Sequence, residues 1–145
     1  MGNVSLNEAI LLLQNSRVAD FNIWRFKNLT LKLDLSNMDF SDKNLSGACL
    51  NGALCKGSNF SDSKLSRINL VQADLTGALL MLAEMDRCSL IDANLTVTNL
   101  MGARLRNANL SGSRMIRTVL IEADLKDTNI SVEGRSQAYT KFAKF

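Results

Sequence analysis

The chain has 145 residues, a formal net charge of +3 and 46% apolar residues, with three cysteines, no histidine and no proline. This length and apolar content indicate one folded domain and exclude a disordered chain. The lack of histidine excludes every His-based catalytic triad and most zinc sites. No apolar run is long enough to span a membrane, and the first residues do not resemble a signal peptide, so we expect a cytoplasmic protein with reduced thiols.

Two elements are predicted before the main pattern begins. Ser5 and Glu8 form a capping-box pattern, and apolar residues follow it at helical spacing, which predicts a helix over residues 5–16. Leucines at positions 29, 31, 33 and 35 then alternate with polar residues. This alternation predicts a strand that leads into the next region.

A five-residue repeat occupies most of the remaining chain. Each of the twenty positions numbered in multiples of five from Leu35 to Ile130 is apolar. At 46% apolar content, chance would give this result with a probability on the order of 10⁻⁷. The residue two places earlier is small in sixteen of the twenty cases: Ala in nine, and Ser, Thr or Cys in seven. The exceptions are Leu33, Met38, Lys43 and Ile68.

A period of five fits neither a helix nor a straight strand. Five helical residues turn through about 500°, so the apolar stripe would wander around the helix. In a straight strand an odd period would send successive large residues to opposite faces. The backbone must therefore turn a corner after each short extended segment and wind into coils whose small and large residues both point inward. Adjacent coils would pair at about 4.8 Å.

The segments Ala73-Asp74-Leu75-Thr76-Gly77, Ala93-Asn94-Leu95-Thr96 and Ala108-Asn109-Leu110-Ser111-Gly112 resemble the pentapeptide-repeat family. The resemblance implies an all-β solenoid: a right-handed quadrilateral β-helix with four pentapeptides per coil, hence about five coils, roughly 24 Å long. It also points to a bacterial protein. A buried Lys43 would be costly, so we expect its stem to reach outward or the first coil to be distorted.

The resemblance also divides the chain into three regions. Residues 1–32 form an N-terminal helix and lead-in cap, in which residues 21–25 resemble the family's lead-in segment. Residues 33–132 form the β-helix, and residues 133–145 a short C-terminal cap or tail. We expect Ala138, Tyr139, Phe142 and Phe145 to pack as a last helical turn or two over the final coil. The alternative, known for some gyrase-binding members, is that this segment joins two copies into a dimer.

Residues twenty apart share a face in such a coil, so the charges can be sorted by face. The face carrying Phe40 to Leu120 has a net charge of −4, from Asp39, Asp42, Asp62 and Glu122. The face carrying Leu45 to Leu125 has +2, or +3 with Lys43, and the other two have +1 and −1. Because acids interrupt the basic face and no aromatic residues accompany it, we expect a solvated, salt-bridged wall and no nucleic-acid site.

Between Asp62 and Glu122 the acidic face carries outward apolar residues. They are Leu79, Met81, Leu82, Met101, Val119 and Ile121. A contiguous apolar patch of this kind indicates an interaction surface for a protein partner or a second copy. The alternatives are that a terminal segment covers it, or that an irregular coil shifts the register.

The remaining residues do not indicate a catalytic or ligand-binding site. Cys55 and Cys88 fall at inward positions and Cys49 at an outward one, while the glycines at 47, 52, 57, 77, 102 and 112 belong to corners. We expect no catalytic residue, no metal site and no cofactor. The predicted function is a non-enzymatic scaffold for protein–protein interaction. The alternative, which the resemblance suggests, is a DNA-mimicking inhibitor or protector of a type II topoisomerase.

Overall fold

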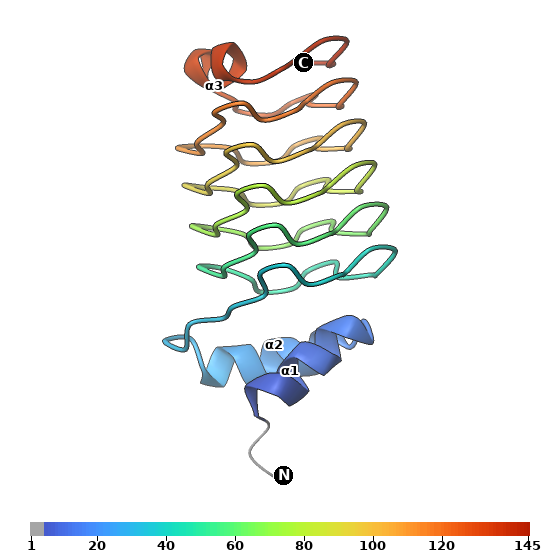
Figure 1. Cartoon of the computed structure of the whole chain (residues 1–145), viewed down its shortest axis with the longest axis vertical. Coiled ribbons are helices and arrows are strands. Elements are labelled where there is room, and N and C mark those ends of the chain that lie inside the picture. The colour runs from blue at the N-terminus through green and yellow to red at the C-terminus, as the bar shows by residue number, and fades with distance from the viewer. Residues whose placement is uncertain (1–4) are drawn as a thin grey trace.

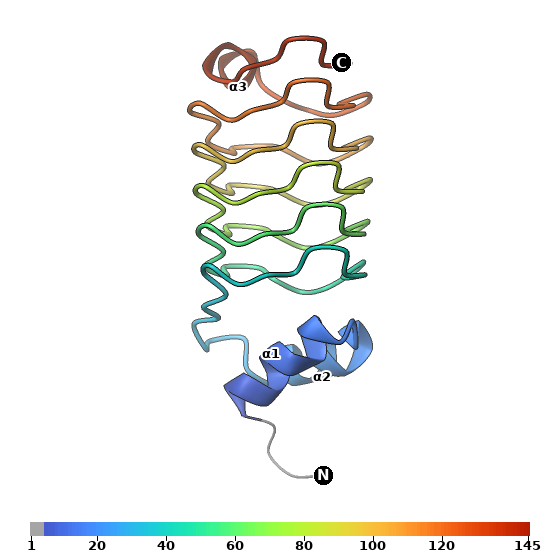
Figure 2. The same ribbon diagram turned by 45° about the vertical axis from the view of Figure 1, so that its right-hand side comes forward.

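In the computed structural model, which describes residues 5–145, the chain forms a stack of coils with helices at both ends (Figure 1). The helices α1 (Leu6–Gln14) and α2 (Val18–Lys27) lie at the N-terminal end of the stack. The short helix α3 (Val132–Gln137) lies at the opposite end, and both views show the coils as nearly parallel layers between them (Figure 2). None of the helices in residues 5–145 has the length and hydropathy needed to cross a membrane.

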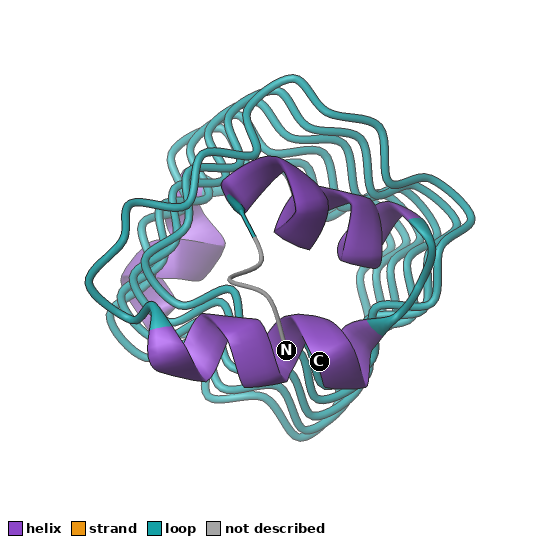
Figure 3. Ribbon diagram, turned by 90° about the horizontal axis from the view of Figure 1, so that it is seen from below, coloured by secondary structure: helices purple, strands orange, loops and turns teal. Residues whose placement is uncertain are grey.

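Each coil pairs with the next through parallel bridges between residues twenty apart, from Asp34 and Leu54 to Arg104 and Asp124. The N–H of Leu35 donates to the carbonyl of Leu54 at 2.7 Å, and the N–H of Leu54 donates to the carbonyl of Leu33 at 2.9 Å. Twenty residues per coil equal four pentapeptides, and the coil is four-cornered when seen along its axis (Figure 3).

The bridges stay isolated, so the β content differs from that of an ordinary sheet. Among the described residues the ladder contains single bridged positions and no continuous strand, because a corner follows each bridged residue. The strand expected through residues 29–35 does not form, because residues 28–31 make a turn and Asp34 alone in this stretch is bridged. Leu29 and Leu31 are 53% and 40% exposed, whereas Leu33 and Leu35 are fully buried.

The interior is filled as the repeat predicts. All twenty large positions from Leu35 to Ile130 are buried, and the rings of Phe40 and Phe60 stack with centroids 5.2 Å apart. Hydroxyl groups at small positions bond to backbone carbonyls: Thr98 Oγ1 donates to Leu75 at 2.7 Å. These bonds allow Ser and Thr to replace Ala inside the coil. Lys43 is half-buried, and the coil around it keeps its bridges, so the first coil is not distorted.

The corner residue lies two places after each large residue and has a left-handed backbone. Every such residue from Asn37 to Asp127 has a positive φ. Glycine holds six of these positions and Asn or Asp six more, which are the residues that adopt this conformation most readily. Leu82 and Val97, with φ of 59° and 52°, are unfavourable choices at such a corner.

The residue before each large position is often Asn or Asp, and its side chain closes the turn. The Oδ1 atom of Asp39 accepts the backbone N–H of Ser41 at 2.9 Å, and Asn59 and Asn94 make the same contact two residues ahead. This is the Asx-turn geometry, which holds the backbone at the start of the corner.

The N-terminal helices cover the open end of the first coil. The capping box is present, with Ser5 Oγ accepting from the N–H of Glu8 and Glu8 Oε2 accepting from the N–H of Ser5. The predicted helix thus begins as expected and ends at Gln14 rather than residue 16. The lead-in segment is itself helical, as the middle of α2. Phe21 and Trp24 of α2, with ring centroids 5.8 Å apart, belong to the same buried cluster as the coil interior.

A buried arginine fastens α2 to the coil. Arg25 is 2% exposed, and its Nη1 donates to the carbonyls of Asn28 and Leu31 at 2.9 Å each. Its Nη2 donates to the carbonyl of Asn51 at 3.0 Å, across to the first coil. Burial lowers the pKa of Arg25 from its ordinary value. Asn22 of α2 reinforces this joint, because its Oδ1 accepts the N–H of Cys49 at 2.9 Å.

The C-terminal segment differs from the expectation. The helix forms earlier, at Val132–Gln137, where Glu133 and Arg135 occupy the small and large positions of the repeat and cannot be buried inside a coil. The chain then returns to the coil register, with bridges from Val119 to Tyr139 and from Asp124 to Lys144. Tyr139, Phe142 and Phe145 are 56%, 70% and 46% exposed, so the predicted helical turn with these rings packed over the coil is wrong.

We predict that Arg25→Ala lowers the free energy of unfolding by about 3 kcal/mol, because three carbonyls lose a buried charged donor. Urea denaturation of the purified protein measures this change. Arg17→Ala is the matched control, since Arg17 pairs with Asp20 only at the exposed surface of α2 and its loss should change little. An unchanged midpoint for Arg25→Ala would contradict the anchoring role.

Acid should destabilise the corners. Hydrogen bonds from the N–H and hydroxyl of Ser41 lower the pKa of Asp39, and those of Ser36 lower the pKa of Asp34. A carboxyl whose folded pKa lies below its unfolded value stabilises the fold above about pH 4 and loses that contribution as the pH falls further. Asn makes the same turn contact without titrating, as at Asn59. The Asp34→Asn/Asp39→Asn variant should therefore lose less stability than the parent between pH 7 and pH 3, measured by thermal unfolding across that range.

Candidate interaction surface

One side of the stack carries all six residues predicted to bind a partner. Successive bridges join Asp39, Asn59, Leu79, Asn99, Val119 and Tyr139 into one column, and the predicted residues flank or belong to it. We call the set Leu79, Met81, Leu82, Met101, Val119 and Ile121 the apolar band. The twenty-residue register holds through this region, so the possible register error did not occur.

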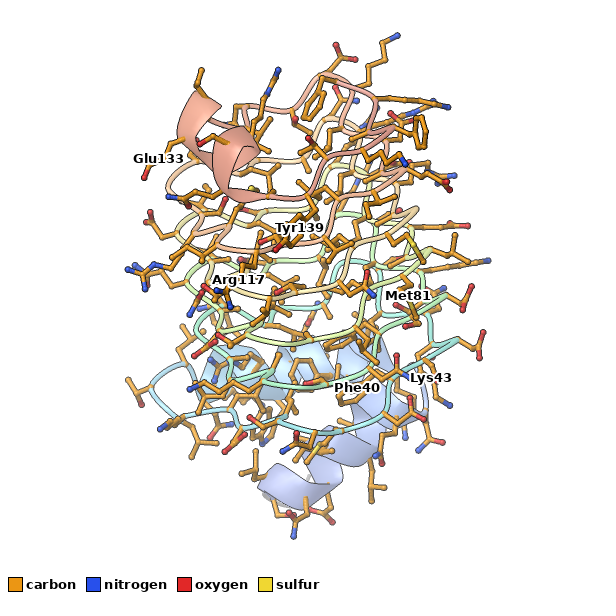
Figure 4. All side chains as sticks on the ribbon, turned by 45° about the horizontal axis from the view of Figure 1, so that its top comes forward. Phe40, Lys43, Met81, Arg117, Glu133 and Tyr139 are labelled. Carbon is orange, nitrogen blue, oxygen red and sulfur yellow. The ribbon has the colours of Figure 1, made fainter. Side chains whose placement is uncertain are left out.

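The band is partly solvent-exposed. Leu82, Met101 and Leu79 are 61%, 40% and 38% exposed, while Met81, Val119 and Ile121 are half-buried. Phe40 lies inside the coil and Met81 at its outer surface (Figure 4). The side chain of Leu82 leans over the next coil, because a Cβ added to Gly102 would lie 2.7 Å from Leu82 Cδ2. Leu82 therefore joins two coils into one continuous apolar surface.

The terminal segments do not cover the band. Helices α1 and α2 meet the stack at its N-terminal end, where Asn22 and Arg25 bond to Gly47 and Asn51 of the first coil. The C-terminal residues from Tyr139 onward stack on the last coil in register instead of folding back along the side. Within the described part of the chain, the band thus remains open.

Two further residues extend the same face and were not predicted. Tyr139 bridges to Val119, and Phe142 lies one coil beyond Glu122 in the same register. Both are more than half exposed. The twenty-residue register alone would have found them, but Arg135 and Thr140 stand at multiples of five and hid the return to the coil.

Two corner residues of this face have an unfavourable backbone. Leu82 and Phe142 have φ of 59° and 60°, a region that costs a leucine or phenylalanine about 1 kcal/mol relative to glycine. Each also exposes most of its apolar side chain. Neither choice stabilises the isolated fold, since Gly or Asn would suit these corners better.

Charge is unevenly distributed along the face. Asp39, Asp42 and Asp62 lie on its N-terminal coils, before the apolar band. Beyond the band, Lys141 lies one coil past Ile121, and its Nζ is 5.0 Å from the centroid of the Phe142 ring. Glu122 follows Ile121 at the C-terminal edge of the band. The face therefore runs from three acids through the apolar band, with one further acid at its edge, to an aromatic end that carries Lys141.

The neighbouring face is a network of ion pairs. Arg104 Nε lies 2.7 Å from Asp86 Oδ2, and Arg104 Nη2 lies 3.6 Å from Glu84 Oε2. Arg106 Nε lies 2.6 Å from Asp124 Oδ2, which raises the pKa of Arg106 and lowers that of Asp124. These arginines are engaged with neighbouring carboxylates, as the salt-bridged wall predicts.

The thiols lie where the register puts them. Cys55 and Cys88 are buried, and burial raises the pKa of each to about 12, so both are unreactive. Cys49 is half-buried because α2 lies against its coil. Within residues 5–145, no group of three or more His, Cys, Asp or Glu residues is placed to hold a metal ion.

Comparison with known proteins agrees with this architecture. The family model "Pentapeptide repeats" matches residues 58–96 and 98–131 in eight copies, which together make half of the chain. A comparison with curated proteins gives no match.

Three solved structures are similar. A pentapeptide repeat protein from Nostoc is 31% identical, with 70% of this chain and 84% of that chain covered and a TM-score of 0.62. One from the Arabidopsis thaliana thylakoid lumen is 29% identical, with 76% and 77% covered and a TM-score of 0.63. One from the cyanobacterium Cyanothece is 20% identical, with 87% and 94% covered and a TM-score of 0.56.

These likenesses imply the right-handed quadrilateral β-helix for the coils described above. The family model, the solved relatives and the twenty-residue bridge register agree with one another, and the chain belongs to the pentapeptide repeat family.

Proposed function

We propose that the protein is a non-enzymatic scaffold that binds a protein partner through the apolar band. The observation that carries this proposal is the exposure of Leu79, Leu82 and Met101 on one continuous face. Solvated walls of a coil need polar residues there, and exposed contiguous apolar surface is typical of interaction sites. Methionines add adaptability to such a surface, because their side chains are flexible and polarisable.

The backbone at Leu82 supports the same proposal. A corner with positive φ favours Gly, Asn or Asp, and the chain uses these residues at most of its other corners. A leucine there costs stability and leaves most of its side chain in water. Contact with a partner would bury that side chain and offset the cost.

The distribution of acids does not favour the alternative, mimicry of duplex DNA toward a type II topoisomerase. Such mimicry needs a long acidic stripe that can meet a basic groove. Here Asp39, Asp42 and Asp62 occupy one end of the face, and the apolar band separates them from Glu122. A DNA supercoiling assay with the purified protein tests this alternative directly, and inhibition would favour it over the scaffold.

The scaffold proposal predicts that Leu82→Asn removes partner binding without unfolding the protein. Asn suits the left-handed corner, so the free energy of unfolding should stay equal or rise slightly, while the band loses its most exposed residue. The measurement compares the proteins that the immobilised parent and variant retain from an extract of the native host, together with thermal unfolding of both.

Val97→Asn is the matched control. Val97 also has a positive φ and is 47% exposed, but it lies on a different face of the coil. The Val97→Asn variant should gain the same small increase in the free energy of unfolding, and it should retain the same host proteins as the parent. If Leu82→Asn retains the same host proteins as the parent, or if Val97→Asn loses them as fully as Leu82→Asn does, a role for the apolar band is contradicted.

A further inference from the structure

We propose that the partner on this face is a second copy of the chain, packed side by side and antiparallel, with Met101 of each copy meeting at the two-fold axis. This inference rests on the proposed function, because it names the occupant of the same apolar band. It is carried by the order of charges along the face.

The face is complementary to itself when one copy is inverted. Its N-terminal coils carry Asp39, Asp42 and Asp62, its middle coils carry the apolar band, and its C-terminal extension carries Lys141 beside Phe142. Inverting one copy about Met101 brings Asp62 of each face to the coil of Lys141 in the other copy, while Asp39 and Asp42 lie beyond its last coil and stay in solvent. A parallel pair would instead set the three acids against their own copies, where like charges repel.

The twenty-residue register fixes which residues would meet. A two-fold axis in the plane of contact, perpendicular to the coil axis and level with Met101, makes the contact isologous. The coil of Met81 then faces the coil of Ile121, and that of Asp62 faces that of Phe142. Lys141 rests against the Phe142 ring, so its ammonium group lies beside Asp62 of the other copy. Asp62 and Lys141 thereby form two symmetric pairs around an apolar centre.

The shape of the centre suits a close contact. Gly102 follows Met101 and lacks a side chain, and Leu82 covers part of it. Glu122 lies at an exposed corner and can keep its carboxylate in water at the rim. One side of a narrow coil is smaller than a standard interface, so we expect a weak, concentration-dependent dimer.

Sedimentation of the purified full chain over a wide micromolar range tests the proposal. The parent should shift from monomer to dimer with concentration. Met101→Lys should weaken the dimer by about tenfold or more, because it sets two ammonium groups at the axis. Val97→Lys, on another face, should leave the dimer unchanged.

Charge exchange tests the orientation. Asp62→Lys alone and Lys141→Asp alone should each weaken the dimer, and the double variant should restore it, because both pairs are then reversed. In a Cys49→Ser background, Met101→Cys should give a disulfide-linked dimer under mild oxidation, and Val97→Cys should not. A dimer without rescue by the double variant, or without the Met101→Cys cross-link, would overturn the antiparallel arrangement.

The outcomes separate this inference from the proposed function. A parent that stays monomeric at every concentration, yet retains a host protein that Leu82→Asn loses, would overturn the second copy as partner and leave the scaffold in place. A monomeric parent that retains no protein through the band would overturn both.

Discussion

The left-handed corner at every fifth residue is the constraint on which the rest of the structure depends. It turns the backbone so that the small and large residues of each pentapeptide point inward on all four sides, and it returns the chain to the same position after twenty residues. The interior is then too narrow for two large residues side by side, which is why Ala, Ser or Thr precedes most of the large ones. Asn and Asp before the large position fasten the corner through Asx turns.

The same corner makes the outer surface a set of columns. Residues twenty apart in sequence become neighbours about 4.8 Å apart. Charged or apolar side chains that are far apart in the sequence therefore come together on one side of the stack. The ion pairs of Arg104 and Arg106 arise in this way, because each joins residues eighteen or twenty apart in sequence. The apolar band arises similarly, and its corner residue Leu82 departs from the residues that the backbone prefers.

The ends of the stack depend on residues that break the repeat. Glu133 and Arg135 cannot enter the interior, and the chain forms α3 there before it returns to the coil. At the first coil, α1 and α2 supply apolar cover, and the buried Arg25 donates to carbonyls of the lead-in and, at Asn51, of the coil itself. An uncovered end would leave backbone groups and apolar interior open to other chains.

The sequence alone determined the coil interior and the composition of each face. A strict period of five excludes helix and straight strand, so the inward residues from Leu35 to Ile130 and the shared face of Leu79 and Met101 follow from counting. Only the tertiary structure determined how the two ends of the coil stack are built. Arg25 is a buried anchor only because α2 lies across the first coil, and Tyr139 and Phe142 join the apolar face only because the chain regains its register after α3. The five-residue repeat specifies whether each side chain points inward or outward. The ends of the stack depend instead on contacts between the coils and terminal segments that lie outside the repeat.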